Sequence, residues 1–221
     1  MKLYTYYRSQ ASFRVRIALN LKGLAREDVH LHLERGHQFA PEYRALNPQM
    51  VVPTLLDGET KLFQSLAILE YLAENFPAAA LWPTDAAARA HARAIAAEMH
   101  AGFVPLRRHC PMNFWRPVKR RDLTAEVAAN VARIDAMWSE CRARFGAGGP
   151  FLFGRFSAAD AMYAPVVSRF QTYDVQVGPV SRGYMDAVMA LPAWAEWRHA
   201  AVKEPWVLAE DEPDWPTVLR A

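Results

Sequence analysis

The sequence predicts a small mixed α/β domain followed by an all-helical domain, and three observations support this fold class. The first third alternates short apolar runs with helical stretches in the order βαβ, α, ββα, which implies a mixed sheet covered by helices. After a linker at about residues 78–83, long Ala-rich amphipathic stretches replace the strand-like runs. The chain has 221 residues, 52% of them hydrophobic, which is enough for two small domains that share an interface. We therefore divide the chain into domains at residues 1–77 and 85–221.

The elements of the first domain follow from apolar periodicity and from turn residues. Asp57-Gly58 between two short β-prone runs is a hairpin signal, and Asn47-Pro48 and Phe76-Pro77 each end a helix. The expected strands are Leu3–Tyr6, Val29–Leu33, Thr54–Leu56 and Thr60–Phe63. The expected helices are Ser12–Leu21, Pro41–Leu46 and Ser65–Asn75.

The second domain is predicted to contain helices alone. Three glycines within residues 146–149 interrupt the helical pattern and mark a loop. Ser157 and Asp160 have the spacing of a capping box, whose loss is expected to cost about 1 kcal/mol of stability and to leave the chemistry intact. The tail after Glu204 contains three prolines and is expected to run over the surface. The expected helices are Asp85–Arg108, Thr124–Phe145, Ser157–Thr172, Arg182–Ala190 and Ala193–Ala201.

Composition argues against several classes of protein. The net charge is only +3 and the basic residues are scattered, which does not support a nucleic-acid-binding face. The two cysteines, Cys110 and Cys141, indicate neither a disulfide framework nor a metal cluster. No apolar run is long enough to cross a membrane, and the first residues lack the apolar segment of a signal peptide. We therefore expect a cytoplasmic protein with no metal, no nucleic-acid partner and no membrane partner.

A serine lies where the first predicted strand meets the first predicted helix. In this connection the hydroxyl of Ser9 is next to the unpaired amides of a helix N-terminus, which favour an anion. A thiol bound there ionises more easily, because the hydroxyl and the helix dipole stabilise the thiolate. Ser9 or Ser12 also fits a simple N-cap, and both interpretations stay open at this point.

Two later segments are compatible with ligand binding. If the Val52–Pro53 bond is cis, the amide and carbonyl of Val52 turn outward and pair with a peptide-like ligand. A trans proline at the start of a strand is the alternative. Ser65 begins a helix directly after Gln64, so its amide and hydroxyl can hold a carboxylate, cap the helix, or do both.

These features occur together with short stretches of sequence that match a known family. The matching stretches are Leu3–Ser9, Arg14–Leu19, Gln38-Phe39, Ala45–Pro48 and Gln64–Ile68. They resemble the N-terminal domain of cytosolic glutathione transferases, most closely the zeta class, which includes maleylacetoacetate isomerase. The resemblance implies a thioredoxin-like βαβαββα domain followed by an all-α domain. It also implies a cis bond before Pro53, glutathione as co-substrate and a homodimer.

The resemblance assigns roles to the matched positions of the glutathione site. Ser9 is expected to hydrogen-bond the glutathione sulfur and to activate it. Val52, before Pro53, is expected to pair with the backbone of the cysteinyl residue of glutathione. Gln64 and Ser65 are expected to hold its γ-glutamyl end.

The remaining positions of this site include a departure from the family pattern. Gln38 is expected to reach the glycine end of glutathione, with help from His37, which also fits an ordinary surface histidine. Gln10 and Ala11 are expected to line the site next to Ser9. The zeta signature at this point is Ser-Ser-Cys-Ser, and this chain replaces its second serine and its cysteine. Because that cysteine is associated with the isomerase chemistry of the class, the substitution argues against isomerase activity.

The second substrate needs a mostly apolar pocket with few polar groups. The residues expected to line it are Tyr7, Arg8, Phe103, Arg107 and Arg108. The two adjacent arginines of this set would suit an acidic or electron-rich substrate, and an exposed helix surface explains them equally well.

We expect a glutathione transferase that activates the thiol through Ser9 for attack on a small electrophile. The first alternative is the zeta-class reaction, in which reversible addition of the thiol isomerises maleylacetoacetate. The second alternative is a non-catalytic binding module with the same fold.

Overall fold

The first domain is built on a four-stranded mixed sheet. In this computed structural model, which describes residues 1–221, the strand order is β2-β1-β3-β4, with β1 parallel to β2 and antiparallel to β3. The hairpin expected at Asp57-Gly58 joins β3 to β4. The elements of this domain are β1 (Lys2–Thr5), α1 (Gln10–Leu21), β2 (Glu27–His30), α2 (Pro41–Arg44), β3 (Thr54–Asp57), β4 (Thr60–Phe63) and α3 (Ser65–Asn75).

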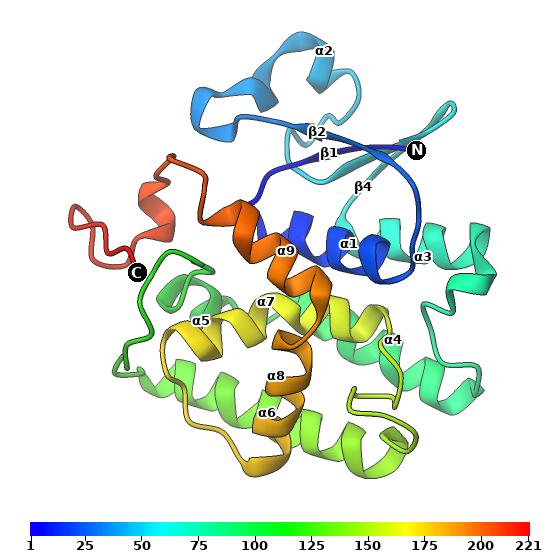
Figure 1. Cartoon of the computed structure of the whole chain (residues 1–221), viewed down its shortest axis with the longest axis vertical. Helices are drawn as coiled ribbons and strands as arrows, with labels where there is room; N and C mark the ends of the chain where they lie inside the picture. The colour runs from blue at the N-terminus through cyan, green and yellow to red at the C-terminus, as the bar shows by residue number, and fades with distance from the viewer.

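Helices cover the sheet on the side that faces the second domain. Figure 1 shows α1 and α3 between the sheet and the helical domain, and α2 on the opposite side of the sheet. The buried apolar residues of α1 include Phe13, Val15 and Ile17, which join the main hydrophobic core of the molecule. The core therefore continues from the sheet through α1 into the second domain.

The second domain packs its helices around α7. Every residue of α7 except Gln171 is buried, and this helix packs against α1 of the first domain as well as against α4 and α8. None of the helices combines the length and apolarity needed to span a membrane. The helices of this domain are α4 (Ala86–Ala101), α5 (Val104–His109), α6 (Ala125–Phe145), α7 (Ala158–Thr172), α8 (Pro179–Met189) and α9 (Pro192–Ala201).

The single helix expected at Asp85–Arg108 is wrong, because the structure divides it into α4 and α5. Gly102 leaves the helical conformation, and a Cβ there would lie 2.7 Å from the backbone oxygen of Glu98. Phe103 then adopts a left-handed conformation with φ of 56°, and Pro105 lies in the first turn of α5. The other predicted elements agree with the structure to within three residues.

The tail after α9 is also different from the expectation of a surface segment. The side chains of Glu204 and Glu212 are buried, and the backbone N–H of Ala221 donates to the carbonyl oxygen of Trp115 at 2.6 Å. Figure 1 shows the tail next to the loop after α5 and close to the first domain. The tail is therefore part of the contact between the two domains.

Candidate active site

Ser9 is the N-cap of α1. Its backbone is extended, with φ −79° and ψ 115°, and its Oγ accepts a hydrogen bond from the N–H of Ser12 at 3.2 Å. No acidic side chain lies in the first turn of α1, so the positive end of the helix dipole has no compensating charge there. The capping role expected of Ser9 is confirmed. Because the Oγ accepts in this bond, its hydroxyl proton is available for a ligand.

The loop before β3 has the backbone that the resemblance implied. The Val52–Pro53 peptide bond is cis. The carbonyl oxygen of Val51 accepts from the hydroxyl of Tyr43 at 2.6 Å and from Nδ2 of Asn47 at 2.8 Å. These buried side chains fix the backbone that leads into Val52.

Ser65 begins α3, and its side chain is buried against the second domain. Its Oγ accepts from Nη1 of Arg14 at 3.4 Å and lies 3.9 Å from the sulfur of Met162 on α7. Gln64 precedes it with φ of 74° and donates from Nε2 to Oε1 of Gln49 at 2.5 Å. The first turn of α3 is therefore held by residues from α1 and from the loop before β3.

Two glutamines of the expected glutathione site carry polar atoms without partners. Gln10 lies in the first turn of α1, next to the half-buried Ala11, and Gln38 lies in the short 3-10 helix His37–Phe39. The Oε1 atoms of both glutamines are buried and accept no hydrogen bond. His37 is exposed, with its ring 5.4 Å from that of His32. Each of these two glutamines therefore has an unpaired hydrogen-bond acceptor in the structure.

The residues expected around the second substrate have different environments. Tyr7 is half-buried, with its ring 5.0 Å from that of Trp197 on α9. Phe103 is buried, Arg107 is half-buried, and its neighbour Arg108 is exposed. The two adjacent arginines, which the sequence could not distinguish, therefore differ in burial.

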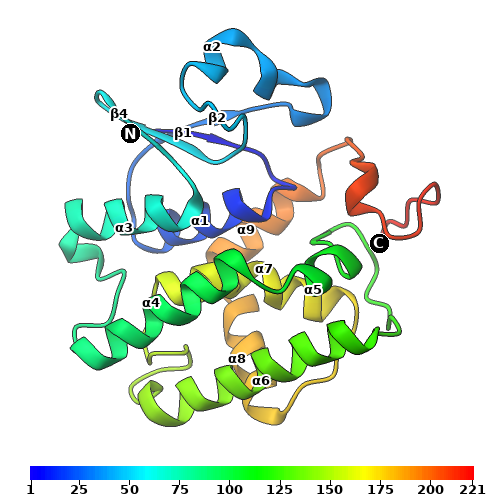
Figure 2. The same cartoon turned by 180° about the vertical axis from the view of Figure 1, so that it is seen from behind.

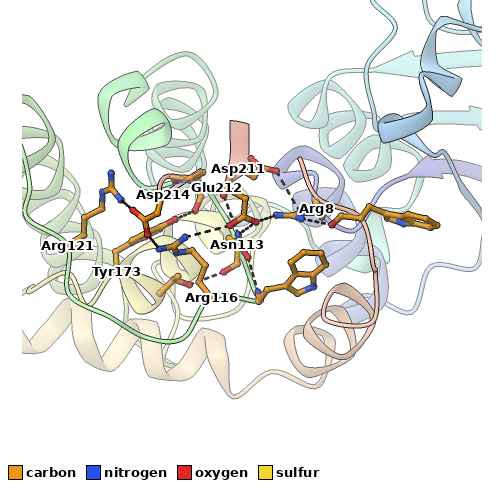
Figure 3. Close-up of polar contacts among 12 residues, drawn as sticks. Arg8, Asn113, Arg116, Arg121, Tyr173, Asp211, Glu212 and Asp214 are labelled. Atoms are coloured by element: carbon orange, nitrogen blue, oxygen red, sulfur yellow. Dashed lines mark hydrogen bonds and ion pairs between the residues drawn. The ribbon is translucent and has the colours of Figure 1, made fainter. Parts of the chain in front are cut away.

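Arg8 is neutralised by the tail, and Figure 3 shows this arrangement. Its Nη2 donates to Oε1 of Glu212 at 2.9 Å, and its Nη1 donates to the carbonyl oxygen of Trp206 at 2.7 Å. The carboxylate of Asp211 lies 4.0 Å from its Nε, and the guanidinium lies 4.3 Å from the ring centre of Trp115. The guanidinium of Arg8 is thus directed to the tail.

Sequence reasoning missed a buried arginine on α1. Arg14 is 2% exposed, and its only side-chain hydrogen bond is the one to Ser65. Burial and the nearby guanidiniums of Arg107 and Arg169 lower its pKa to about 9. The signal in the sequence is a cation between Phe13 and Val15 on the apolar side of a helix, where an arginine is rarely found without a partner.

Proteins of known family resemble this chain over nearly its whole length. The family models for the glutathione S-transferase N-terminal domain and C-terminal domain match residues 1–74 and 124–200. A probable maleylacetoacetate isomerase of Vibrio cholerae is 34% identical over 88% of this chain and 93% of that protein. The holo structure of a maleyl pyruvate isomerase, described as a bacterial zeta-class glutathione S-transferase, has a TM-score of 0.67 at 32% identity, covering 93% of this chain and 99% of that one. The structure of a Methylobacterium extorquens maleylacetoacetate isomerase with bound malonate and GSH has a TM-score of 0.65 at 31% identity. The match covers 93% of this chain and 98% of that one.

These similarities agree with the architecture described above. The thioredoxin-like first domain and the helical second domain are confirmed, as is the resemblance to the zeta class. This chain therefore belongs to the glutathione S-transferase family, and zeta-class isomerases are among its similar relatives.

Proposed function

We propose that this protein is a glutathione-dependent cis–trans isomerase of a maleyl-type acid. The observation that carries the proposal is the Ser9 hydroxyl at the uncompensated amino end of α1, five residues before the buried, carboxylate-free guanidinium of Arg14. The sequence favoured a transferase and kept the isomerase as an alternative. Relatives named maleylacetoacetate isomerase and maleylpyruvate isomerase favour the isomerase.

The residues present fit glutathione. The unpartnered Oε1 atoms of Gln10 and Gln38 suit the N–H groups of a peptide-like ligand. Ser65, at the start of the 11-residue helix α3, suits a carboxylate, because the amides of a helix N-terminus attract an anion. We propose that these residues, with Ser9 and the backbone of Val52, hold glutathione.

In the proposed reaction, side chains and backbone amides of this chain stabilise the negative charges of the thiolate and of the acid. Glutathione supplies a thiol that adds reversibly to the cis double bond and leaves after rotation about it. The Ser9 hydroxyl and the amides of the first turn of α1 stabilise the thiolate form. Neither cysteine of the chain replaces this thiol, because burial raises the pKa of Cys110 to about 11 and that of Cys141 to about 12. Unpaired arginines stabilise negative charge that develops on the acid.

The test is Ser9→Ala assayed by loss of the cis acid, with maleylacetoacetate as substrate. We expect turnover to fall about 100-fold, because a single hydrogen-bond donor to a developing anion has an effect of this size. Glutathione affinity, measured by calorimetry, should change little, because Gln10, Gln38 and Ser65 remain. Unchanged turnover in the variant would remove Ser9 from the mechanism.

Thr124→Ala is the matched control for the loss of the helix cap. Thr124 is the N-cap of α6 and accepts from the N–H of Val127 at 3.3 Å, as Ser9 does from Ser12. Both variants should lose about 1 kcal/mol of unfolding free energy, whereas only Ser9→Ala should lose turnover.

Consumption of glutathione distinguishes the remaining alternatives. An isomerase returns every glutathione molecule, whereas a transferase consumes one for each product. A folded protein that neither turns over the acid nor binds glutathione would support the binding module. We also propose a homodimer, which predicts a solution mass of twice the 25.0 kDa of one chain.

A further inference from the structure

The turn that carries Ser9 is tied to the tail of the chain through Arg8. The backbone N–H of Ser9 donates to the carbonyl oxygen of Tyr6 at 3.0 Å, so Arg8 lies within a tight turn directly before α1. The guanidinium of Arg8 donates to the carbonyl oxygen of Trp206 and to the carboxylate of Glu212, which lie 198 and 204 positions later. Figures 1 and 2 show the tail from opposite sides, next to the loop after α5. The residue before the proposed thiol-activating serine is thus held by a segment far along the sequence.

Glu212 is the main partner of Arg8 in the tail. The side chain of Glu212 is 0% exposed and that of Arg8 is 5% exposed. Oε1 of Glu212 accepts from Nη2 of Arg8 and from Nδ2 of Asn113, each at 2.9 Å (Figure 3). Its Oε2 lies 3.6 Å from Nη1 of Arg116, and the guanidinium of Arg8 lies 4.3 Å from the ring centre of Trp115. The ion pair of Arg8 and Glu212 is therefore enclosed by protein groups.

Glu212 is the only carboxylate within hydrogen-bonding distance of Arg8. Asp211 is the next, at 4.0 Å from Nε of the arginine. Burial raises the pKa of Asp211 to about 6, against the lowering effect of the Arg8 charge. The carboxylate of Asp214 pairs with other arginines of the region, and that of Glu204 lies against a histidine of β2. The charge of Arg8 is thus balanced mainly by one glutamate.

A free cation at Arg8 would act on a thiol bound at Ser9. Consecutive Cα atoms are about 3.8 Å apart, and these two residues belong to one turn. A nearby guanidinium lowers the pKa of a thiol and increases the fraction of thiolate. A thiolate stabilised in this way is also a weaker nucleophile, so the most reactive thiol is one whose pKa lies near the ambient pH. Cancellation of the Arg8 charge therefore leaves thiol activation to the Ser9 hydroxyl and the amides of α1.

We propose that Glu212 is a positioning residue for thiol activation, which holds and neutralises Arg8 so that the thiolate is not stabilised beyond what Ser9 and α1 provide. The inference rests on the proposed function, because it takes glutathione as the thiol next to Ser9. The hydrogen bonds of Glu212 with Asn113 and Arg8 join the tail to the loop after α5 and to the turn before α1. They fix the place of the Arg8 guanidinium as well as its charge.

The test is a titration of glutathione bound to the full chain, followed by the ultraviolet absorbance of the thiolate. Glu212→Gln keeps the shape of the side chain and an acceptor oxygen for Arg8 and Asn113, and loses only the charge. We expect the pKa of the bound thiol to be lower in this variant by about 1, because a unit charge acting over about 10 Å in a partly buried site has an effect of this size. Arg8→Gln should raise the same pKa, because the carboxylate of Glu212 then lacks its closest cation.

Two control variants separate the pairing with Arg8 from the general charge of the tail. Glu212→Asp keeps the carboxylate and should give a thiol pKa close to that of the wild type. Asp214→Asn removes a tail carboxylate that pairs with Arg116 and Arg121 and not with Arg8, so it should also leave the thiol pKa unchanged.

Isomerase kinetics provide a second measurement. In Glu212→Gln the acidic limb of the pH profile of kcat should move to lower pH, and the plateau above it should fall about threefold, because the nucleophilicity of a thiolate falls with its pKa. A structural loss alone would lower the rate at every pH without moving the limb.

Several outcomes would overturn the role of Glu212. An unchanged or higher thiol pKa in Glu212→Gln with glutathione bound would do so and would leave the proposed function in place. An equal decrease in Asp214→Asn would assign the effect to the tail as a whole. A lower thiol pKa in Glu212→Gln without isomerisation by the wild type would retain the role of Glu212 and reject the isomerase. A folded wild type that binds no glutathione would reject both proposals.

Discussion

At the scale of single residues, Glu212 neutralises two buried cations. Its Oε1 accepts from Arg8 at 2.9 Å and from Nδ2 of Asn113 at 2.9 Å, and its Oε2 lies 3.6 Å from Nη1 of Arg116 (Figure 3). The glutamate is 3% exposed. Because both guanidiniums are also largely buried, removal of this carboxylate leaves Arg8 with Asp211 alone and Arg116 with Asp214 alone as ion-pair partners.

We therefore predict that Glu212→Ala lowers the unfolding free energy by about 3 kcal/mol, the usual cost of removing one partner of a buried ion pair. Urea denaturation measures this change. Glu210→Ala is the control, because Glu210 is exposed and makes no ion pair, so its loss should change stability by less than about 0.5 kcal/mol. Equal effects of the two variants would contradict the bridging role of Glu212.

Sequence reasoning identified Ser9 and Ser65 as helix-start residues because a helix N-terminus has a local signature. It expected Arg8 to line the substrate pocket and had no means of finding the partner of this arginine, which lies 204 positions away. The same limit applies to Arg14. Its burial is visible as an odd cation in an apolar helix face, but the absence of a carboxylate around it depends on the tertiary packing.

At the scale of elements, most helices and strands follow from local patterns, and the division of α4 from α5 shows what was overlooked. Gly102 and Pro105 lie three residues apart, which is the ordinary spacing of a helix stop followed by a helix start. The Ala-rich periodicity before Gly102 continues in phase with the apolar residues after it, so periodicity alone indicated one helix. The division matters because it sets the start of the short helix that carries Arg107.

The start of α7 depends on one buried carboxylate. The capping box expected at Ser157 and Asp160 is confirmed, since Oδ2 of Asp160 accepts from the N–H of Ser157 at 2.7 Å. Its Oδ1 also accepts from the N–H of Leu152 at 3.0 Å, a bond that fixes the preceding loop. We predict that Asp160→Ala lowers the unfolding free energy by about 3 kcal/mol, because two buried N–H groups lose their acceptor. This exceeds the cost of about 1 kcal/mol expected from the sequence for a cap alone.

Thermal or urea unfolding measures the effect of Asp160→Ala. Asp186→Ala is a suitable control, since Asp186 is exposed and pairs only with Arg182 one helical turn away. That pair should contribute about 0.3–0.5 kcal/mol. If the two substitutions cost the same, the buried carboxylate of Asp160 does not fix the start of α7.

At the scale of the whole molecule, the tail joins the two domains through groups that titrate. Glu204 is 7% exposed and lies 3.2 Å from Nε2 of His30. Burial raises the pKa of Glu204 to about 7, against the lowering effect of the nearby backbone N–H of Tyr7 and of the charge of Arg8. Between pH 4.5 and 7 the folded protein therefore keeps a proton that the unfolded chain has lost.

Glu204 therefore lowers the unfolding free energy as pH rises from 4.5 to 7. Burial and His32 lower the pKa of His30, which acts in the opposite direction, so a single pH profile does not isolate the glutamate. We predict that Glu204→Gln gains stability relative to the wild type by up to about 3 kcal/mol between pH 4.5 and 8. Urea denaturation at several pH values measures the difference. The unfolding free energy of Glu210→Gln should change with pH as that of the wild type does. If the pH profile of Glu204→Gln is also parallel to that of the wild type, Glu204 does not contribute to the pH dependence of stability.

The pairing of Arg8 with Glu212 also has a consequence for the order of events during protein synthesis. Arg8 is made 204 residues before Glu212. A domain made first folds first on the ribosome, so the sheet and α1 form while Arg8 still lacks its carboxylate. The nascent chain thus passes through a stage in which this cation is open to water and to any anion nearby, and only the arrival of the tail ends it.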